Sequence, residues 1–494
     1  MLFNSVTFLG LFLPIICILY WQLKGNARLW LLLLGSTTFY GFWRIEFVPL
    51  MLGSAVMDYY LALLIDRQED PIKRKRLMQI SLVVNLGILG FFKYFIFFRN
   101  SVFSLAEVLG FHPSFTTLNI ILPLGISFYI FQTLSYTIDV YRRDLPPERN
   151  MLRYLTFVTF YPHLVAGPIM RPDILIPQLK DPAPFDGQQV RRGIERIIAG
   201  LFLKVVLADT IAGFVDQGFG GNIAQMSAFD AWTLAFLFGF QIYFDFAGYS
   251  SIAIGSAMIM NIYVPENFNF PYVSTSPREF WKRWHISLST WIRDYVYIPL
   301  MGRYREPGHG AWDTLAESSE SAPGAAKVTE GKRTRALFST WAIMGLWHGA
   351  NWTFVLWGVY HAAMVWAQRV ISPRIRMPGG VIGALIGVAI TLPLMMAAWI
   401  PFRAVSLHDT FTLWGKMLDP RQYHAFGLAP NSYMMAAALT VLMFIVWFVR
   451  DRIVPRLAAN GTPLIVAKTA YLTVAIAVVF VMLEVKSAFI YFQF

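Results

Sequence analysis

A series of long apolar runs constrains this chain more than any other feature of its sequence. A membrane-spanning helix needs about 20 mostly apolar residues, and twelve such runs predict an all-α polytopic membrane protein with about eleven or twelve crossings. The runs are residues 2–23, 27–43, 47–65, 77–98, 117–138, 150–170, 194–216, 228–263, 336–368, 379–402, 431–449 and 463–484. We expect the first run to be retained as a membrane helix, because no small-residue cleavage site follows it.

The charged residues stand between these runs. They make up 14% of the chain, whereas ordinary globular proteins contain about 25%. The net charge of +12 does not predict a nucleic-acid partner, because the cations are spread over the loops, as in membrane proteins. Basic clusters after alternate runs, such as 73–76, 142–149 and 450–456, place these loops in the cytoplasm and both chain ends outside.

The sequence contains none of the motifs that carry several common chemistries. The single cysteine, Cys17, lies inside the first apolar run, which excludes a disulfide framework and a CxxC metal site. The eight histidines are scattered, and no metal is expected. Phosphate-loop, GxSxG and HExxH motifs are absent. We expect residues 1–494 to form a single membrane domain, in which the polar stretch 303–335 is a flexible cytoplasmic loop.

The run 336–368 is flanked by basic residues at both ends. It contains 368 − 336 + 1 = 33 residues, whereas two full crossings need about 40. The run therefore predicts a broken or re-entrant helical pair that enters and leaves on the cytoplasmic side. Its tip should remain inside the protein, since irregular backbone at membrane depth is tolerated only where it is buried or lines a wet cavity.

His348 lies near the expected tip of this pair, in a stretch without formal charges. On one continuous helix it would share a face with Trp341, Gly345 and Trp352, and Gly345 would leave open space beside the imidazole. A histidine can take a hydroxyl proton near neutral pH. His348 is therefore either a general base or acyl-transfer residue in a lined cavity, or a hydrogen-bonded core residue. His361 lies 361 − 348 = 13 positions further, about 220° round a continuous helix, so it need not face the same space and is expected to be structural.

Residues 277–300 mix aromatic and basic side chains, as in a helix that lies at a membrane interface. The i, i+4, i+8 spacing would give this helix a polar stripe of His285, Ser289 and Arg293. The segment is interpreted either as a plain interfacial helix or as a cytoplasmic vestibule. In the second case, cations such as Lys282 and Arg283 would bind the phosphates of an acyl carrier.

Asp245 is the only formal charge between positions 231 and 265, and Gln241 lies one turn before it. An isolated buried carboxylate is very costly. Asp245 should therefore have a partner within hydrogen-bonding distance, as a buried structural anchor or, less favoured, as a catalytic group.

Several motifs in combination resemble the membrane-bound O-acyltransferase superfamily, and more closely its bacterial branch that contains the alginate O-acetyltransferase membrane subunit. They are FYPHLVAGPIMRP (160–172), QIYFDFAGYSSIAIG (241–255), ENFNFPYVS (266–274), the His285 segment, GLWHGANWTFVLWG (345–358) and FIYFQF (489–494). The resemblance covers most of the chain. The insert 303–335 is longer and more polar than expected for that branch.

The resemblance implies a ring of about eleven tilted helices around a tunnel from a cytoplasmic donor site to an outer acceptor site. The family's catalytic histidine maps onto His348 and its second histidine onto His285. Acetyl-CoA would dock near Lys282 and Arg283, and Asn351 would be a polar tunnel or structural residue, like Asp245, Gln241 and Gly345.

The family also implies a place and a partner. The chain would lie in the bacterial cytoplasmic (inner) membrane with periplasmic termini. An extracytoplasmic SGNH-type acetyltransferase would complete the transfer to a polysaccharide. Whether His348 is a general base or a transient acyl carrier, and whether the donor is acetyl-CoA or another thioester, remain open. Other acceptors (cellulose, peptidoglycan, teichoic acid, lipid) also remain open. A non-enzymatic transporter is a further alternative, because charged residues inside the membrane are typical of transporters too.

Overall fold

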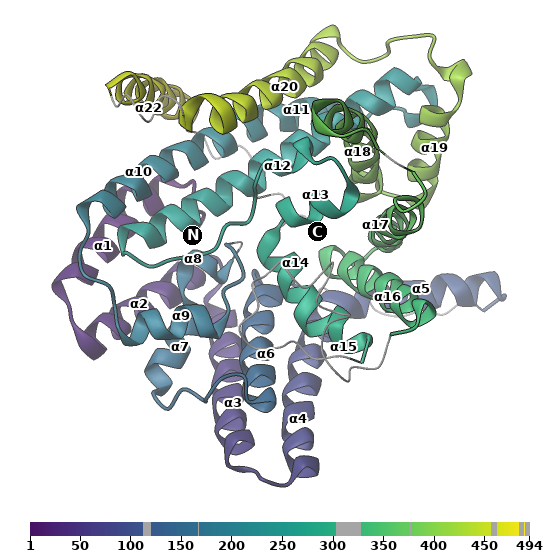
Figure 1. Ribbon diagram of the computed structural model, residues 1–494. Helices are drawn as coiled ribbons and strands as arrows, with labels where there is room; N and C mark the ends of the chain where they lie inside the picture. The colour runs from purple at the N-terminus through teal and green to yellow at the C-terminus, as the bar shows by residue number, and fades with distance from the viewer. Residues whose placement is uncertain are drawn as a thin grey trace. The chain divides into compact units, whose positions relative to one another are not determined.

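The computed structural model describes residues 1–111, 120–165, 167–302, 328–375, 377–455, 462–483 and 489. In this part the chain is nearly all helical and contains no strand (Figure 1). The predicted all-α class is confirmed. The chain divides into one unit of Met1–Ile197 with Ser250–Pro265 and a second unit of Ile198–Tyr249 with Glu266–Phe494.

The first unit contains the N-terminal helices. They are η1 (Phe8–Phe12), α1 (Leu13–Gln22), α2 (Gly25–Gly41), η2 (Ile45–Phe47), α3 (Val48–Arg67), α4 (Pro71–Leu89), η3 (Gly90–Tyr94), α5 (Phe95–Val108), α6 (Ile126–Arg142), α7 (Met151–Thr159), α8 (Tyr161–Leu164), α9 (Pro172–Lys180) and α10 (Gly187–Leu201) as far as Ile197. The end of α12 (Ala228–Ile259), from Ser250, also belongs to it.

Helices α3, α4 and α6 of this unit lie side by side (Figure 1). Asp70 starts α4 by accepting hydrogen bonds from two backbone N–H groups of its first turn, which is a common way to begin a helix. Within the bundle, the buried carboxylate of Asp58 on α3 accepts hydrogen bonds from Ser81 Oγ at 2.6 Å and Asn85 Nδ2 at 2.8 Å on α4. These polar contacts fix the pairing of two otherwise apolar helices.

The second unit contains the later helices. They are η4 (Phe202–Ala208), α11 (Asp209–Phe219), η5 (Ile223–Gln225), α12 as far as Tyr249, η6 (Pro271–Val273), α13 (Pro277–Arg283), α14 (Ile286–Ile292), η7 (Arg293–Tyr297), α15 (Ile298–Leu300), α16 (Glu330–His348), α17 (Trp352–Ile371), α18 (Gly380–Arg403), α19 (Leu407–Leu418), η8 (Pro420–Gln422), α20 (Pro430–Phe448), η9 (Val449–Ile453) and α22 (Thr462–Met482).

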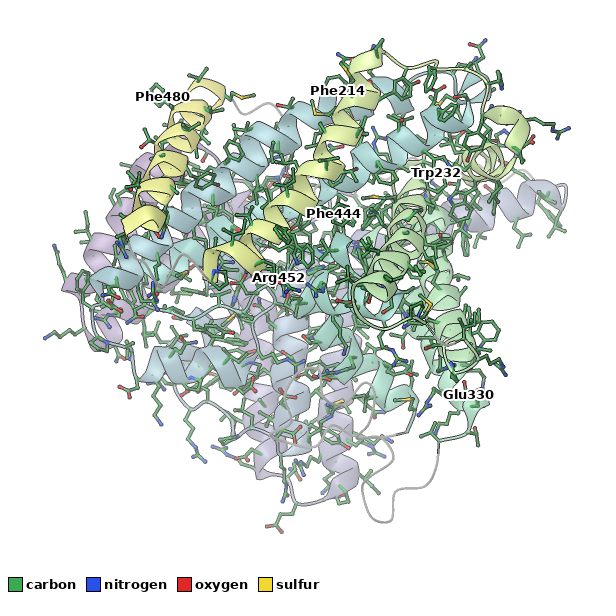
Figure 2. All side chains as sticks on the ribbon, turned by 45° about the horizontal axis from the view of Figure 1, so that its top comes forward. Phe214, Trp232, Glu330, Phe444, Arg452 and Phe480 are labelled. Carbon is green, nitrogen blue, oxygen red and sulfur yellow. The ribbon has the colours of Figure 1, made fainter. Side chains whose placement is uncertain are left out.

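Seven helical stretches in the described part are long and apolar enough to cross a membrane. They are Ile45–Arg67, Pro71–Val108, Gly187–Phe219, Ala228–Ile259, Gly380–Arg403, Pro430–Ile453 and Ile465–Met482. Exposed apolar side chains lie along α20 and α22, among them Phe448 and Phe480, and Figure 2 labels Phe480 on α22. Such surfaces suit lipid. The chain is a multi-pass membrane protein, whereas the count of about eleven crossings and the ring stay predictions.

Two predicted segments differ from the structure. The run 150–170 is not one crossing helix: α7 ends at Thr159, Phe160 leaves the helical conformation, and Pro162 occupies the start of the single turn α8, where proline is tolerated. The loop predicted over 303–335 falls mainly outside the described residues. Its last part is already helical, because the side chain of Thr329 caps the start of α16.

Candidate active site

The predicted broken pair is present as the hairpin of α16 and α17, whose helices pack along each other. Helix α16 ends at His348 and α17 begins at Trp352. Asn351 starts α17, since its side-chain oxygen accepts the backbone N–H of Thr353 at 3.1 Å. The structure therefore gives Asn351 a capping role at the tip of the hairpin.

The sequence predicted that Gly345 would leave open space beside His348, but the structure places Gly345 against the backbone of α17. A Cβ atom at Gly345 would lie 2.2 Å from the carbonyl oxygen of Phe354, and one at Gly358 would lie 2.1 Å from that of Trp341. Both glycines therefore let the two helices approach to backbone contact. The expectation was wrong because it assumed one continuous helix; Trp352, placed on the same face, lies on the next helix and is exposed.

His348 is buried among aromatic rings. The centroid of its ring lies 4.8 Å from that of Trp347, 4.8 Å from that of Trp357 and 5.3 Å from that of Phe402. Trp347 is adjacent in sequence, whereas the other two rings come from α17 and α18. The three helices thus enclose the imidazole in an apolar setting, where an electrostatic interaction is stronger than in water.

The ring of Trp357 contacts both His348 and His361, whose centroids lie 4.8 Å and 4.7 Å from its own. Trp281 Nε1 donates a hydrogen bond to His361 Nδ1 at 3.3 Å. The ring of Trp341 stacks on His361 at 5.4 Å. We refer to Trp281, Trp341, Trp357, Trp399 and Phe402 as the aromatic cluster. His361 was not expected beside His348, because its direction was counted along an unbroken helix; the i, i+4 spacing of Trp357 and His361 on α17 is the signal that could have placed it.

The predicted helix over residues 277–300 is broken at His285. This residue has φ +42° and precedes α14. Asn267 holds the break: its backbone oxygen accepts the N–H of Ile286 at 3.0 Å, and its side-chain oxygen accepts the hydroxyl of Ser287 at 2.6 Å. A non-glycine residue in the left-handed region costs of order 1 kcal/mol or more, which the surrounding contacts must offset.

The predicted polar stripe is therefore wrong. His285 precedes α14, Ser289 lies within it and donates to the carbonyl oxygen of Trp284 at 3.2 Å, and Arg293 begins η7. The imidazole of His285 is fully buried, with its ring centroid 6.1 Å from that of Trp347. Since Trp347 also contacts His348, the structure brings the two predicted histidines to the same tryptophan.

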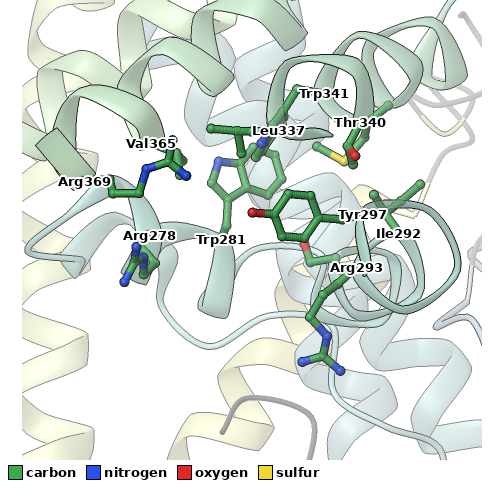
Figure 3. Close-up of a pocket in the computed structure, with 12 residues that line it drawn as sticks. Arg278, Trp281, Ile292, Arg293, Tyr297, Leu337, Thr340, Trp341, Val365 and Arg369 are labelled. Atoms are coloured by element: carbon green, nitrogen blue, oxygen red, sulfur yellow. The ribbon is translucent and has the colours of Figure 1, made fainter. Parts of the chain in front are cut away.

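A pocket of about 140 Å³ lies among α13, α14, η7, α16 and α17 (Figure 3). Its lining includes the side chains of Arg278, Arg293, Arg369, Trp281, Trp341 and Tyr297. The pocket extends along α16 as far as Met344, which is about one turn before His348. The arginines come from three different segments, and none of them was singled out as a donor-binding residue by the sequence.

The basic residues near this pocket differ in whether they line it and in whether a carboxylate already balances their charge. Arg283, a predicted phosphate ligand, is paired with Glu279 at 2.8 Å and does not line the pocket. Burial raises the pKa of the Glu279 carboxyl, but hydrogen bonds from Thr275 and Arg283 outweigh it and hold that pKa below its usual range. Lys282 is half-buried on the same helix and also does not line the pocket.

All three pocket arginines keep side-chain N–H groups without a hydrogen-bond partner in the described part of the chain. Arg278 forms no ion pair there. Arg293 is 6% exposed and pairs with Asp294 at 2.5 Å, yet its Nη1 has no hydrogen-bond partner in that part. Arg369 binds Glu330 at 2.7 Å and Thr334 at 2.9 Å through Nη2, and its Nε has no partner in that part. Each of the three guanidinium groups can therefore offer an N–H to an anion, and the charge of Arg278 is the least committed.

Asp245 has the partner that the sequence analysis required. Lys204 Nζ lies 2.8 Å from Asp245 Oδ1 and 2.8 Å from Asp209 Oδ1, and all three side chains are buried. Gly248 permits this contact, because a Cβ there would lie 2.9 Å from the backbone nitrogen of Lys204. The structural interpretation of Asp245 is favoured. Gln241 is half-buried, and its side-chain oxygen has no partner among the described residues.

Comparisons with known proteins identify the family of this chain. Residues 142–311 and 323–405, which contain both histidines and the pocket, match the membrane-bound O-acyltransferase (MBOAT) family. The probable alginate O-acetylase AlgI of Pseudomonas putida is 37% identical over 85% of this chain and 80% of that protein. The peptidoglycan O-acetyltransferase of Helicobacter pylori is 32% identical over 100% of this chain and 98% of that protein. The teichoic acid D-alanyltransferase of Bacillus subtilis is 28% identical over 50% of this chain and 59% of that protein. The chain is therefore an acyltransferase that belongs to the membrane-bound O-acyltransferase family.

Proposed function

We propose that this acyltransferase takes an acetyl group from cytoplasmic acetyl-CoA and passes it across the bacterial inner membrane for O-acetylation of an extracytoplasmic polysaccharide, alginate or a similar exopolysaccharide. The observation that carries the proposal is the arginine-lined pocket that ends one turn from the buried His348. The names of the relatives, which refer to alginate and peptidoglycan, support an acceptor in the cell envelope.

The basic end of the hairpin indicates the side of the membrane from which the donor enters. Arg369 on α17 contacts Thr334 on α16, and further basic residues flank this end of the hairpin, which is typical of the cytoplasmic side. His348 lies 348 − 334 = 14 residues further along α16, or about 21 Å at 1.5 Å per residue. A donor entering at the arginine end would therefore deliver its acyl group deep into a hydrocarbon layer about 30 Å thick.

Arg278 and Arg293 are the residues that we assign to the phosphates of the donor. Guanidinium groups bind phosphate oxygens through paired, charge-assisted hydrogen bonds. Lys282 and Arg283, which the sequence suggested, take a secondary place at the entrance, because neither side chain lines the pocket. The aromatic side chains of Trp281 and Tyr297 line the same pocket between the arginines (Figure 3).

His348 acts as the base in the proposed reaction. Its imidazole takes the proton of an acceptor hydroxyl while the hydroxyl oxygen attacks the thioester carbonyl carbon. The C–S bond then breaks, and the departing thiolate receives that proton from the imidazolium. In the alternative course, an imidazole nitrogen attacks the carbonyl carbon first and carries the acetyl group to the hydroxyl. His285, which also contacts Trp347, supports the position of that ring and thereby of His348.

The acceptor end requires a second protein, because a large hydrophilic polysaccharide does not enter the bilayer. An extracytoplasmic acetyltransferase of the SGNH type would receive the acetyl group and transfer it to sugar hydroxyls. In this arrangement both termini of the chain lie in the periplasm.

The test is the acetyl content of the cell-surface polysaccharide in a strain from which the gene has been deleted. Complementation with the wild type should restore O-acetylation. His348→Gln should not restore it, although the protein reaches the membrane in equal amount; the rate should fall about 10² to 10⁴-fold when the base is lost. An unchanged acetyl content in the deletion strain would refute the proposal, and altered solute uptake there would favour a transporter.

A further inference from the structure

Three buried N–H donors in and beside the aromatic cluster have no acceptor within the part of the chain that the structure describes. They are Trp357 Nε1, Trp399 Nε1 and His361 Nε2. His361 is a donor at Nε2 in its neutral form, because its Nδ1 accepts the N–H of Trp281. Buried N–H groups without an acceptor are rare and costly. A ligand that brings an oxygen atom into the cluster would give these donors an acceptor.

Trp357 is the donor whose ring contacts His348. The two rings meet edge to face, with 4.8 Å between their centroids and 81° between their planes. The side chain of Trp357 is 0% exposed. Its backbone is held firmly, because the neighbouring Gly358 packs against the carbonyl oxygen of Trp341. The indole is therefore a rigid group beside the proposed base, as a preorganised donor must be.

The pocket stops one aromatic layer short of this tryptophan. Trp281 and Trp341 line the pocket, and their ring centroids lie 5.7 Å and 6.2 Å from that of Trp357. One aromatic layer thus separates the pocket from Trp357. An acyl group held at the inner end of the pocket must pass the rings of Trp281 and Trp341 before it contacts the indole of Trp357 and His348.

We propose that Trp357 is a catalytic residue whose Nε1–H donates a hydrogen bond to the carbonyl oxygen of the acyl thioester. This inference rests on the proposed acetyl transfer. When the acceptor hydroxyl oxygen bonds to the carbonyl carbon, the C=O electron pair moves onto the carbonyl oxygen, and the indole N–H stabilises the negative charge there. When the C=O bond re-forms, the C–S bond breaks, and the sulfur takes the proton that His348 had removed from the hydroxyl.

The experiment removes the N–H while it keeps the ring. Trp357→Phe is compared with wild type in permeabilised cells of the complemented deletion strain, which keep their extracytoplasmic proteins, with radiolabelled acetyl-CoA as donor and alkali-deacetylated polysaccharide of the same strain as acceptor. A second variant carries benzothienylalanine at position 357, which replaces the N–H by sulfur in a ring of nearly the same size. The control is Trp414→Phe, which removes an indole N–H that donates to the carbonyl oxygen of Ala397 at 2.9 Å.

Loss of one oxyanion donor should lower kcat about 10² to 10³-fold in both variants at position 357, with little change in the KM for acetyl-CoA, while Trp414→Phe keeps its kcat. If Trp357→Phe is poorly inserted into the membrane, the kcat of the benzothienylalanine variant decides whether the Trp357 N–H is catalytic. A benzothienylalanine variant with wild-type kcat, or with only a raised KM, would overturn the catalytic role of Trp357. Failure of the proposed function is recognised separately, because the wild type would then transfer no acetyl group and His348→Gln would change nothing.

Discussion

Replacement of Gly345 by alanine tests whether backbone contact between α16 and α17 sets the position of His348. The added Cβ would lie 2.2 Å from the carbonyl oxygen of Phe354, whereas ordinary contact begins at 3.4 Å. The helices must therefore separate locally by about 3.4 − 2.2 = 1.2 Å. Overpacking of this kind costs about 1 to 3 kcal/mol. A shift of about 1 Å near reacting groups can also lower the rate about 10²-fold.

The matched control is Gly331→Ala at the start of the same helix, where an added Cβ meets nothing within 4 Å. Alanine there should stabilise α16 by about 0.5 to 1 kcal/mol, because glycine is a poor helix former. Thermal unfolding in detergent and acetyl transfer in membranes are measured for both variants. Gly345→Ala should be less stable and less active than wild type. Equal stability and activity of the two variants would refute the close contact of the helices.

Three further predictions concern the donor site, the buried ion pair and the topology. Arg278→Glu should raise the KM for acetyl-CoA about 10 to 100-fold, more strongly at low salt, whereas Arg421→Glu on the exposed surface should not; equal KM values would remove Arg278 from the donor site. Lys204→Met should destabilise the protein by about 3 to 5 kcal/mol, since two buried carboxylates lose their cation, and an unchanged unfolding temperature would contradict this. Reporter fusions at Arg335 and Arg374 should both report the cytoplasm, and opposite sides would show that the hairpin crosses the membrane.

The membrane class follows from the sequence because it depends on run length, which is a local property. The broken pair over 336–368 could be predicted for the same reason, from a run too short to cross twice. The position of the break could not, since it depends on Gly349 to Asn351 leaving the helix and on Asn351 capping the next one. Because the prediction assumed one continuous helix, it wrongly placed open space beside Gly345 and wrongly directed His361 away from His348.

Contacts between distant segments were beyond the reach of local patterns. The sequence required a partner for Asp245 but did not identify Lys204, although a lysine inside the run 194–216 was itself a signal. The break at His285 depends on hydrogen bonds that Asn267 accepts, and Asn267 lies 285 − 267 = 18 positions earlier. The pocket arginines belong to segments that meet only in the folded chain.

The glycine contacts of α16 and α17 also bear on how the chain is assembled during synthesis. The two helices are neighbours in sequence, so their contacts form across a short loop, and such local contacts form early. Asn351 satisfies a backbone N–H at the tip without help from another segment, which lowers the cost of carrying the polar tip into the bilayer. The hairpin can thus insert into the membrane as one folded unit. His348 and Trp357 would then contact each other before α13 and α18 pack around them.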